Sequence, residues 1–357
     1  MSIHIKSLPA HDGDCFIISF GEPGSIKNII VDGGRRKPVR KRLKEELDLI
    51  KTNNQKVDLL IVTHIDEDHI QGILKLFETD EVDKTIVEKV WFNSKENLSI
   101  YFNGQEQLDE KLIVSNKHND GNISYQQGIS FGKLLHVLGL SDKNLVFGGQ
   151  VFSLGEAVIK VLSPDIKDLE KIYKDWEKEF PSVVSDGETI SSKDTDYGQT
   201  IEQLILKPFK EDTQLSNGSS IAFSIEYKGK KMLMLGDSFP STVIKYIRAF
   251  YLAEKEKVKI DLTKVSHHAS KFNTNYEFLN LIDCKNYLVS TNGKSHGLPN
   301  KEALARILET SKTGNVKTKL FFNYPDYFSY IFSEKEMETY NFECIYLGTE
   351  KEDQLEV

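Results

Sequence analysis

Two histidines and two aspartates lie within one short stretch of the sequence, residues 64–69 (His-Ile-Asp-Glu-Asp-His). The preceding residues 58–62 are mostly apolar and branched, which predicts a buried strand, and a helical pattern follows. If the chain stays extended beyond the strand, the side chains of His64, Asp66 and Asp68 point the same way. Such groups are costly to pack together without a compensating ion, so the pattern predicts a site for one or two divalent cations. The alternative is a solvated acidic loop with two incidental histidines.

Metal-competent side chains also follow other predicted strands. Asp237, the pair His267-His268 and His296 each come shortly after an apolar run. Open sheets place their binding sites at strand ends, so these residues are candidates for the same site. Taken alone, Asp237 could instead be a helix cap, and His296 could be a loop histidine. The recurrence of the pattern favours a shared site.

The composition is that of an ordinary globular protein. The chain has 357 residues, of which 39% are hydrophobic and 28% are charged. No apolar run approaches the roughly 20 residues of a transmembrane helix, so no membrane partner is expected. The first residues lack the apolar core of a signal peptide, and the three cysteines are far apart in the sequence. These features predict a reducing compartment and a cytoplasmic location.

The net charge gives little support to an extended binding surface for nucleic acid. The net charge is −8, whereas proteins that grip duplex nucleic acid usually carry a basic surface. One local basic cluster lies at residues 35–42. We interpret it as a solvated helix face in preference to a phosphate-binding patch, because most charge runs face solvent.

The chain is predicted to form a single domain, residues 1–357. Residues 2–34 have the alternation of a β-meander, and strands and helices recur through both halves of the chain. A weakly patterned range at about 93–215 is predicted to be a partly helical insertion or lid. Within it, His136 falls on an apolar stripe and is expected to be packed. Near the C-terminus, residues 327–332 are strand-like.

Several motifs resemble those of the metallo-β-lactamase fold superfamily. The stretch His-x-Asp-x-Asp-His at residues 64–69 is similar to its metal motif, with Asp66 where a second histidine is commoner. This variant resembles the branch that holds the nuclease domain of competence DNA-uptake channels and phosphorylcholine esterases. Further stretches resemble motifs of that branch in the same order along the chain: Gly13-Asp14-Cys15 with residues 30–34, Asn217 with Ser219-Ser220-Ile221, Leu235-Gly236-Asp237, residues 267–270 and Ser295-His296-Gly297.

The resemblance implies an α/β fold, a four-layer αββα sandwich of two mixed β-sheets flanked by helices. It also implies two divalent metal ions, Zn²⁺ or Mn²⁺, and a hydrolase that uses a metal-bound hydroxide. Carried over position by position, the metal ligands are His64, Asp66, Asp68, His69, Asp237 and one histidine of the following pair, preferably His267. The implied catalytic residues are Asp68, His268 and His296, the last as a proton donor to the leaving oxygen or a phosphate ligand.

One departure from the family pattern concerns the first metal. Ser163 stands where many members supply a histidine. The metal held by His64 and Asp66 is therefore expected to be bound less tightly than the other, to take a ligand from the insertion, or to be absent.

Three functions compete at this point. The first is a phosphodiesterase or nuclease acting on DNA, which the branch resemblance favours. The second is a hydrolase of small phosphoesters or lactones, which the acidic charge and the insertion favour. The third is a partner-dependent effector module of a bacterial defence system, which Ser163 and the insertion favour. The oligomeric state does not follow from the sequence.

Overall fold

The computed structural model describes residues 2–104, 120–178, 195–251, 257–324, 328–347 and 354–357, with the side chains of residues 120–122 left out. Its strands form two large sheets. The first has the order β16-β1-β2-β3-β4-β5 and the second the order β15-β14-β13-β11-β9-β8-β7-β6, while β10 and β12 form a small parallel pair.

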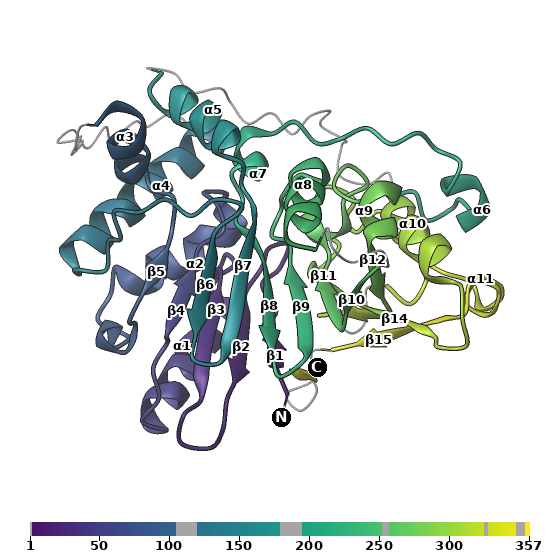
Figure 1. The fold of residues 1–357 in the computed structure, drawn as a ribbon, viewed down its shortest axis with the longest axis horizontal. Coiled ribbons are helices and arrows are strands. Elements are labelled where there is room, and N and C mark those ends of the chain that lie inside the picture. The colour runs from purple at the N-terminus through teal and green to yellow at the C-terminus, as the bar shows by residue number, and fades with distance from the viewer. Residues whose placement is uncertain (1, 105–119, 179–194, 252–256, 325–327, 348–353) are drawn as a thin grey trace.

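The first sheet contains β1 (His4–Ser7), β2 (Phe16–Phe20), β3 (Lys27–Val31), β4 (Leu59–Ile61), β5 (Val90–Trp91) and β16 (Gln354–Glu356). Neighbouring strands are antiparallel from β16 to β3, and β3, β4 and β5 are parallel. Because β16 pairs with β1, the two chain ends lie side by side (Figure 1).

The second sheet contains β6 (Val151–Leu154), β7 (Ala157–Ser163), β8 (Ala222–Tyr227), β9 (Lys230–Met234), β11 (Leu262–Lys264), β13 (Asn286–Val289), β14 (Thr318–Phe322) and β15 (Phe342–Tyr346). Its strands are antiparallel from β6 to β9 and parallel from β9 to β15. The small pair is β10 (Val258–Ile260) with β12 (Ile282–Cys284).

Helices lie on the outer side of each sheet (Figure 1). On the first sheet these are α1 (Lys37–Thr52), α2 (Glu67–Phe77), α3 (Lys95–Asn103), α4 (Asp120–Val137) and α5 (Ile166–Trp176). On the second they are α6 (Ile201–Leu204), α8 (Pro240–Tyr251), α9 (Tyr276–Leu281), α10 (Lys301–Ser311) and α11 (Glu334–Thr339), and the short α7 (Leu215–Gly218) precedes β8. None of the helices in the described part of the chain is long and apolar enough to cross a membrane.

Three apolar cores hold these layers together. Side chains alternate between the faces of a strand, so β2 sends Ile18 into the core between the two sheets and Ile17 into the core under the helices of the first sheet. In the second sheet, Val161 likewise faces the other sheet, whereas Leu162 faces the helices. The order helix, sheet, sheet, helix confirms the predicted αββα sandwich.

The metal loop, defined here as residues 63–69, differs from its predicted extended form. Helix α2 begins at Glu67 with Asp66 as its N-cap residue, so Asp68 lies in the first helical turn. The expected alternation therefore ends at Asp66. Acidic residues in a first turn are favoured by the helix dipole, which is a local reason for the early helix start. The loop is further fixed because Gly33 N donates to the carbonyl of His69, at 2.8 Å.

The range predicted as an insertion divides into two parts. Strands β6 and β7 belong to the second sheet, whereas α3, α4 and α5 form a helical cover at the upper left of the first sheet (Figure 1). The prediction that His136 is packed is wrong. Its side chain is exposed, 3.8 Å from Glu96 Oε1, because the buried face of α4 is formed by residues such as Phe131 and Leu135.

The predicted strand at residues 327–332 is also wrong. Its described part, residues 328–332, forms turns. Phe328, Ile331 and Phe332 are nevertheless buried in the core beside the second sheet. Their apolar pattern therefore reflects burial of a turn and not strand pairing.

Candidate metal centre

The predicted ligands meet where strands of both sheets end. The metal loop follows β4 of the first sheet, Asp237 follows β9 of the second, and the pair His267-His268 follows β11. The oxygen Asp237 Oδ2 lies close to four histidine Nε2 atoms, at 3.9 Å from His64, 3.4 Å from His69, 3.8 Å from His267 and 3.6 Å from His268.

The two aspartates of the metal loop lie on different sides of this centre. Asp66 Oδ2 is 3.5 Å from Nε2 of His64. Asp68 Oδ2 is 3.6 Å from Nε2 of His69 and 3.4 Å from Nε2 of His268. We call these the Asp66 side and the Asp68 side.

Buried polar atoms at the centre lack hydrogen bonds. Among the described residues, the Nε2 atoms of His64, His69 and His268 have no hydrogen-bond partner, nor does Oδ1 of Asp66 or Asp237. A buried polar atom without a partner is costly, and native proteins rarely leave several together. Imidazole nitrogens and carboxylate oxygens around one point are the donor set of a divalent metal, so these residues fit the metals that the fold family implies. Candidate clusters include His64 with His69 and Asp237, and Asp68 with His69 and His268.

Each ring is oriented through its other nitrogen. His69 Nδ1 donates to Asp32 Oδ2 at 2.8 Å, and His268 Nδ1 donates to the carbonyl of Ser290 at 2.7 Å. His64 Nδ1 lies 3.0 Å from Thr63 Oγ1, which itself donates to Asp32 at 2.8 Å. Partners of this kind fix the ring and aim Nε2 at a metal.

The pair His267-His268 has an unusual backbone. The φ angles of His267, His268 and Ala269 are 45°, 51° and 65°, in the left-handed region. Each such residue costs about 1–2 kcal/mol, and strain of this kind collects at functional sites. In an extended strand neighbouring side chains point to opposite faces, whereas here both rings approach Asp237.

The electrostatics of the centre are strongly coupled. Burial opposes the charged form of His69, yet Asp237, Asp68 and Asp32 raise its pKa well above the usual value. Burial likewise opposes the charged form of Asp237, but the surrounding histidines hold its pKa well below the usual value. Burial lowers the pKa of His267, but Asp237 and Asp212 together raise it to about 10. His69 and His267 therefore favour their protonated forms at neutral pH, with positive charge in the place that a cation would take.

Two residues beneath Asp237 were not singled out as a pair from the sequence. Lys264 is fully buried in β11, forms an ion pair with Asp14 and donates to the carbonyl of Gly236 at 3.0 Å. Its Nζ is 3.8 Å from Oδ1 of Asp237, and Asp14 Oδ1 is 3.5 Å from Nδ1 of His268. The sequence did offer one indication of this pair: Lys264 lies inside an apolar strand, and lysine is rarely buried without a partner.

The Asp66 side contacts α7 and the loop before it. Ser216 Oγ donates to Asp66 Oδ2 at 3.0 Å, and the next residue, Asn217, places Nδ2 3.4 Å from Nδ1 of His267. His267 Nδ1 also lies 3.0 Å from Asn273 Oδ1 and 3.4 Å from Asp212 Oδ2. His267 therefore neighbours the residues around Asp66, whereas His268 faces Asp68.

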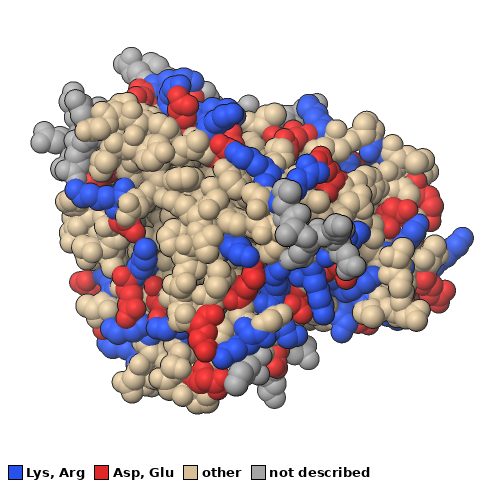
Figure 2. Space-filling model, viewed as in Figure 1, with Lys and Arg blue, Asp and Glu red and all other residues tan. Residues whose placement is uncertain are grey.

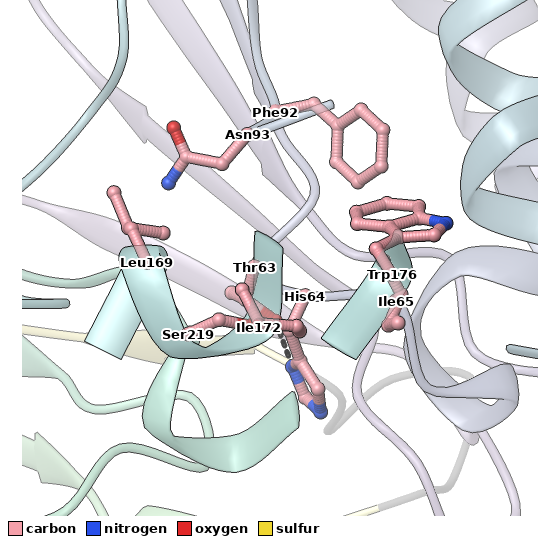
Figure 3. A pocket seen from close by; sticks show the side chains of 9 residues that line it. All are labelled: Thr63, His64, Ile65, Phe92, Asn93, Leu169, Ile172, Trp176 and Ser219. Atoms are coloured by element: carbon pink, nitrogen blue, oxygen red, sulfur yellow. Dashed lines mark hydrogen bonds between the residues drawn. The ribbon is translucent and has the colours of Figure 1, made fainter. Parts of the chain in front are cut away.

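A small cavity lies beside His64 (Figure 3). Its space of about 10 Å³ for the centre of a water-sized sphere is room for roughly one water molecule. Phe92 and Trp176 line it opposite Thr63, and Ile172 and Ser219 complete the wall. The helical cover therefore closes tightly against this side of the metal loop.

Two further residues were singled out from the sequence. His296 is exposed on the loop between β13 and α10, with a φ of 57°. None of the candidate metal clusters found in the described part of the chain contains it. Ser163 is buried at the end of β7, and its Oγ has no hydrogen-bond partner among the described residues.

Part of the chain matches a known protein family. Residues 10–140, which include the metal loop, match the model of the metallo-beta-lactamase superfamily. No curated protein matches the chain. Among solved structures, the metallo-beta-lactamase fold protein YhfI from Bacillus subtilis is 12% identical, with a TM-score of 0.42 over 100% of this chain and 99% of YhfI. CmlA, a diiron beta-hydroxylase from Streptomyces venezuelae, is 12% identical, with a TM-score of 0.41 over 100% of this chain and 54% of CmlA.

The layered architecture, with the superfamily match of residues 10–140, shows a metallo-β-lactamase fold with candidate metal-binding residues. The placement of the chain in the branch of competence-channel nuclease domains and phosphorylcholine esterases stays a prediction.

Proposed function

We propose that this protein is a two-metal phosphodiesterase that acts on DNA. One observation carries the proposal: a single buried carboxylate oxygen, Asp237 Oδ2, lies within 3.9 Å of the Nε2 atoms of four histidines. An oxygen shared in this way fits a ligand that bridges two cations. Two metals roughly 3.5–4 Å apart form the type of site that many phosphatases and nucleases use.

The surroundings of the ligands support an assignment to two metals. Asp68, His69 and His268 would hold the metal of the Asp68 side. On the Asp66 side the ligands would be His64, Asp66 and His267, with Asp237 shared by both metals. This assignment differs from the sequence prediction, which preferred His267 for the Asp68 metal and placed His268 among the catalytic residues.

Zinc or manganese, if held by this set, would supply Lewis-acid activation of water and would neutralise charge on the phosphate. The chain's own residues then bind and orient. Asp32 and the Ser290 carbonyl fix the rings of His69 and His268, so their Nε2 atoms stay aimed at one point. His296, exposed on the loop between β13 and α10, is the proposed proton donor to the leaving oxygen.

The surface does not carry a broad basic footprint on the face shown in Figure 2, where basic and acidic side chains are interspersed around an area of neither kind. The basic cluster at residues 35–42 is partly neutralised, since Arg35 pairs with Asp12 and Arg42 with Glu45. Recognition of DNA is therefore proposed to rest on groups near the metal centre and not on a long groove.

The test is cleavage of supercoiled plasmid and of single-stranded DNA by the full chain loaded with Zn²⁺ or Mn²⁺. We expect nicking that EDTA abolishes and that Asp68→Ala reduces at least about 100-fold, since it removes a metal ligand. Asp48→Ala removes an exposed carboxylate of α1 and should leave cleavage unchanged. Absence of cleavage by the metal-loaded protein, or equal cleavage by Asp68→Ala, would overturn the proposal.

A second candidate is a hydrolase of small phosphoesters or lactones. The observation that favours it is the tight closure of the helical cover on the metal loop, where Gly128 of α4 lies against Ile65 and Trp176. A panel of bis(p-nitrophenyl) phosphate, p-nitrophenyl phosphorylcholine and acyl lactones separates the two candidates. Turnover of these compounds without cleavage of DNA would favour the small-molecule function. A partner-dependent effector role, in a bacterial defence system, predicts instead that the isolated chain turns over none of these substrates.

A further inference from the structure

A hydrogen-bonded network lies at Nδ1 of His267, the ring nitrogen that does not face Asp237. Its central group is Asp212, from the loop before α7, whose side chain is only 8% exposed. The backbone N–H of Asp212 donates to the carbonyl of Phe272 at 3.1 Å, which ties this loop to the segment after the two histidines. The N–H of Gln214 donates to Asp212 Oδ1 at 2.9 Å, so the carboxylate is held in a local turn. Its other oxygen, Oδ2, is turned to the ring.

Two buried amides contact this second oxygen. Asp212 Oδ2 accepts from Nδ2 of Asn217 at 2.7 Å and from Nδ2 of Asn273 at 3.1 Å. The same nitrogen of Asn273 also donates to the carbonyl of Asp237, at 3.2 Å. A carboxylate and a backbone carbonyl can only accept, so they fix which end of the Asn273 amide is the NH₂ group. The opposite end, Oδ1, therefore faces Nδ1 of His267, at 3.0 Å.

This arrangement decides which nitrogen of the His267 ring carries a proton. Because Asn273 Oδ1 can only accept, Nδ1 donates to it. Asp212 Oδ2 is a second acceptor, 3.4 Å from the same Nδ1. Asn217 Nδ2 is also 3.4 Å from Nδ1, but its shorter hydrogen bond goes to Asp212. With the proton of the neutral ring on Nδ1, the lone pair of Nε2 faces Asp237 Oδ2, at 3.8 Å.

We propose that Asp212 is a positioning residue for His267. Acting through Asn273, it holds the ring with its proton on Nδ1, so that Nε2 stays available to a metal ion on the Asp66 side. The inference rests on the proposed function, which assigns His267 to that metal. Partners behind a metal-binding imidazole fix its orientation, and their loss typically costs about 10- to 100-fold in metal affinity. Asp212 lies outside the motifs by which the sequence resembles the metallo-β-lactamase superfamily, so the resemblance does not imply this role.

The first test measures zinc binding by the full chain, with calorimetry and elemental analysis. Wild type should bind two Zn²⁺ ions. Asp212→Ser keeps a side-chain oxygen for the N–H of Gln214, but removes the oxygen that faces the ring. We expect this variant to bind one Zn²⁺ as wild type does and the other about 10- to 100-fold more weakly. Asn273→Ser removes the connecting amide and should weaken binding of the same ion, so the test does not depend on the folding of one variant.

The matched control is Asp142→Ser. Asp142 is also a loop aspartate whose Oδ1 accepts from the N–H two residues further on, that of Asn144, at 3.0 Å. It belongs to none of the candidate metal clusters in the described residues. The control should bind both ions as wild type does. Unchanged affinity for both ions in Asp212→Ser, or an equal loss in Asp142→Ser, would overturn the inference.

A spectroscopic test separates positioning from a general loss of stability. In wild type saturated with Zn²⁺, NMR of isotope-labelled histidines should show a hydrogen-bonded Nδ1–H of His267 that exchanges slowly with water, assigned by its absence from His267→Gln. In Asp212→Ser at saturating Zn²⁺ this proton should exchange faster. The Nδ1–H protons of His69 and His268, which have partners of their own, should exchange as before. Unchanged exchange at His267, or an equal change at all three rings, would reject the positioning role.

Neither test reads turnover, so the inference and the proposed function can fail separately. Two bound zinc ions and a protected Nδ1–H without hydrolysis of any phosphodiester would reject only the proposed reaction. Cleavage of DNA by wild type, together with wild-type zinc binding by Asp212→Ser, would reject only the positioning role. Wild type that binds at most one Zn²⁺ would overturn the inference, whatever it hydrolyses.

Discussion

The Asp68 side and the Asp66 side of the candidate metal centre are supported by different kinds of group. On the Asp68 side, His69 is oriented by a buried carboxylate, Asp32, and the neighbouring Asp14 is paired with the buried Lys264. These partners come from the N-terminal strands and from β11. Charged partners in a buried place are strongly directional, so this side is expected to keep its geometry without a metal.

On the Asp66 side the hydrogen-bond partners of Asp66 and His64 are hydroxyl groups, and one carboxylate, Asp212, lies beside His267. Asp66 accepts from the hydroxyl of Ser216, and His64 lies against the hydroxyl of Thr63. Ser163, for which the resemblance implied a histidine, supplies neither an imidazole nor a carboxylate. If two metals bind, we expect the Asp68 side to hold one at a prebuilt site. The Asp66 side, which depends on His267 and on the helical cover, should hold the other more weakly.

The largest effect is expected where the two sides share a ligand. Asp237→Ala removes the oxygen that faces all four histidines, so both metals should be lost and hydrolysis of bis(p-nitrophenyl) phosphate should fall by at least about 1000-fold. Elemental analysis of the purified variant measures the metal, and circular dichroism checks the fold. A variant that keeps two metals would contradict the shared role of Asp237.

A smaller effect should distinguish the two sides. Asp66→Ala should lose one metal and keep the other, with activity reduced about 10- to 100-fold, because the Asp68 side stands on its own partners. Asp68→Ala should bind less metal overall and lose more activity. Titration with Mn²⁺ followed by elemental analysis gives both stoichiometries. Equal losses in the two variants would end the distinction between a strong and a weak side.

The pH dependence of stability tests the charged network. In the metal-free fold, burial lowers the pKa of His69, but nearby carboxylates, Asp237 above all, raise it overall. The pKa of His267 is likewise raised, to about 10. A raised histidine pKa stabilises the fold below the unfolded value of about 6.5, and this stabilisation is lost as the pH rises toward the folded value. The metal-free protein should therefore lose thermal stability between pH 6.5 and 9.

Metal binding should reverse this loss, because a bound metal displaces the protons. Its affinity should rise about tenfold per pH unit for each proton released. The gain in Tm on adding Zn²⁺ or Mn²⁺ should therefore grow from pH 6 to pH 8.5. A gain that shrinks with rising pH would show that the histidines are not the groups that exchange protons for metal.

How much of this arrangement could be predicted from the sequence depends on how local each part is. The metal loop was predictable because its ligands lie within six residues after a recognisable strand, and the αββα layers followed from the ordered motifs. Asp32 and Lys264 could not be assigned their roles, because their partners come from distant strands. Which of His267 and His268 faces Asp66 and which faces Asp68 depends on the left-handed backbone of this segment. No residue type in the segment predicts that backbone.

The local predictions that failed were inferred from apolar spacing alone. His136 follows the buried residue Leu135 on α4 but turns to solvent beside Glu96. The apolar residues 328–332 are buried without forming a strand. In both places the apolar pattern correctly indicated that neighbouring residues are buried. Tertiary packing determined the exposure of His136 and the turn conformation of residues 328–332.

The smallest expected effect tests whether the helical cover supports the Asp66 side. A Cβ at Gly128 would lie 2.8 Å from Cζ2 of Trp176 and 2.9 Å from Cγ2 of Ile65, which is inside the metal loop. Overpacking of this kind costs about 1–3 kcal/mol, partly offset by the roughly 0.5–1 kcal/mol that alanine gains over glycine in a helix. Gly128→Ala should therefore lower the Tm modestly and weaken metal binding on the Asp66 side.

Gly132→Ala is the matched control on the same helix. Its added Cβ would meet Ser94 Cβ at 3.2 Å and no atom of the metal loop within 4 Å. Its Tm should be unchanged or slightly higher, because the helix gain from alanine is not offset by a clash with a rigid ring. Mn²⁺ titration of both variants decides the point: if Gly128→Ala binds the second metal as wild type does, the cover packs on the loop without supporting the site.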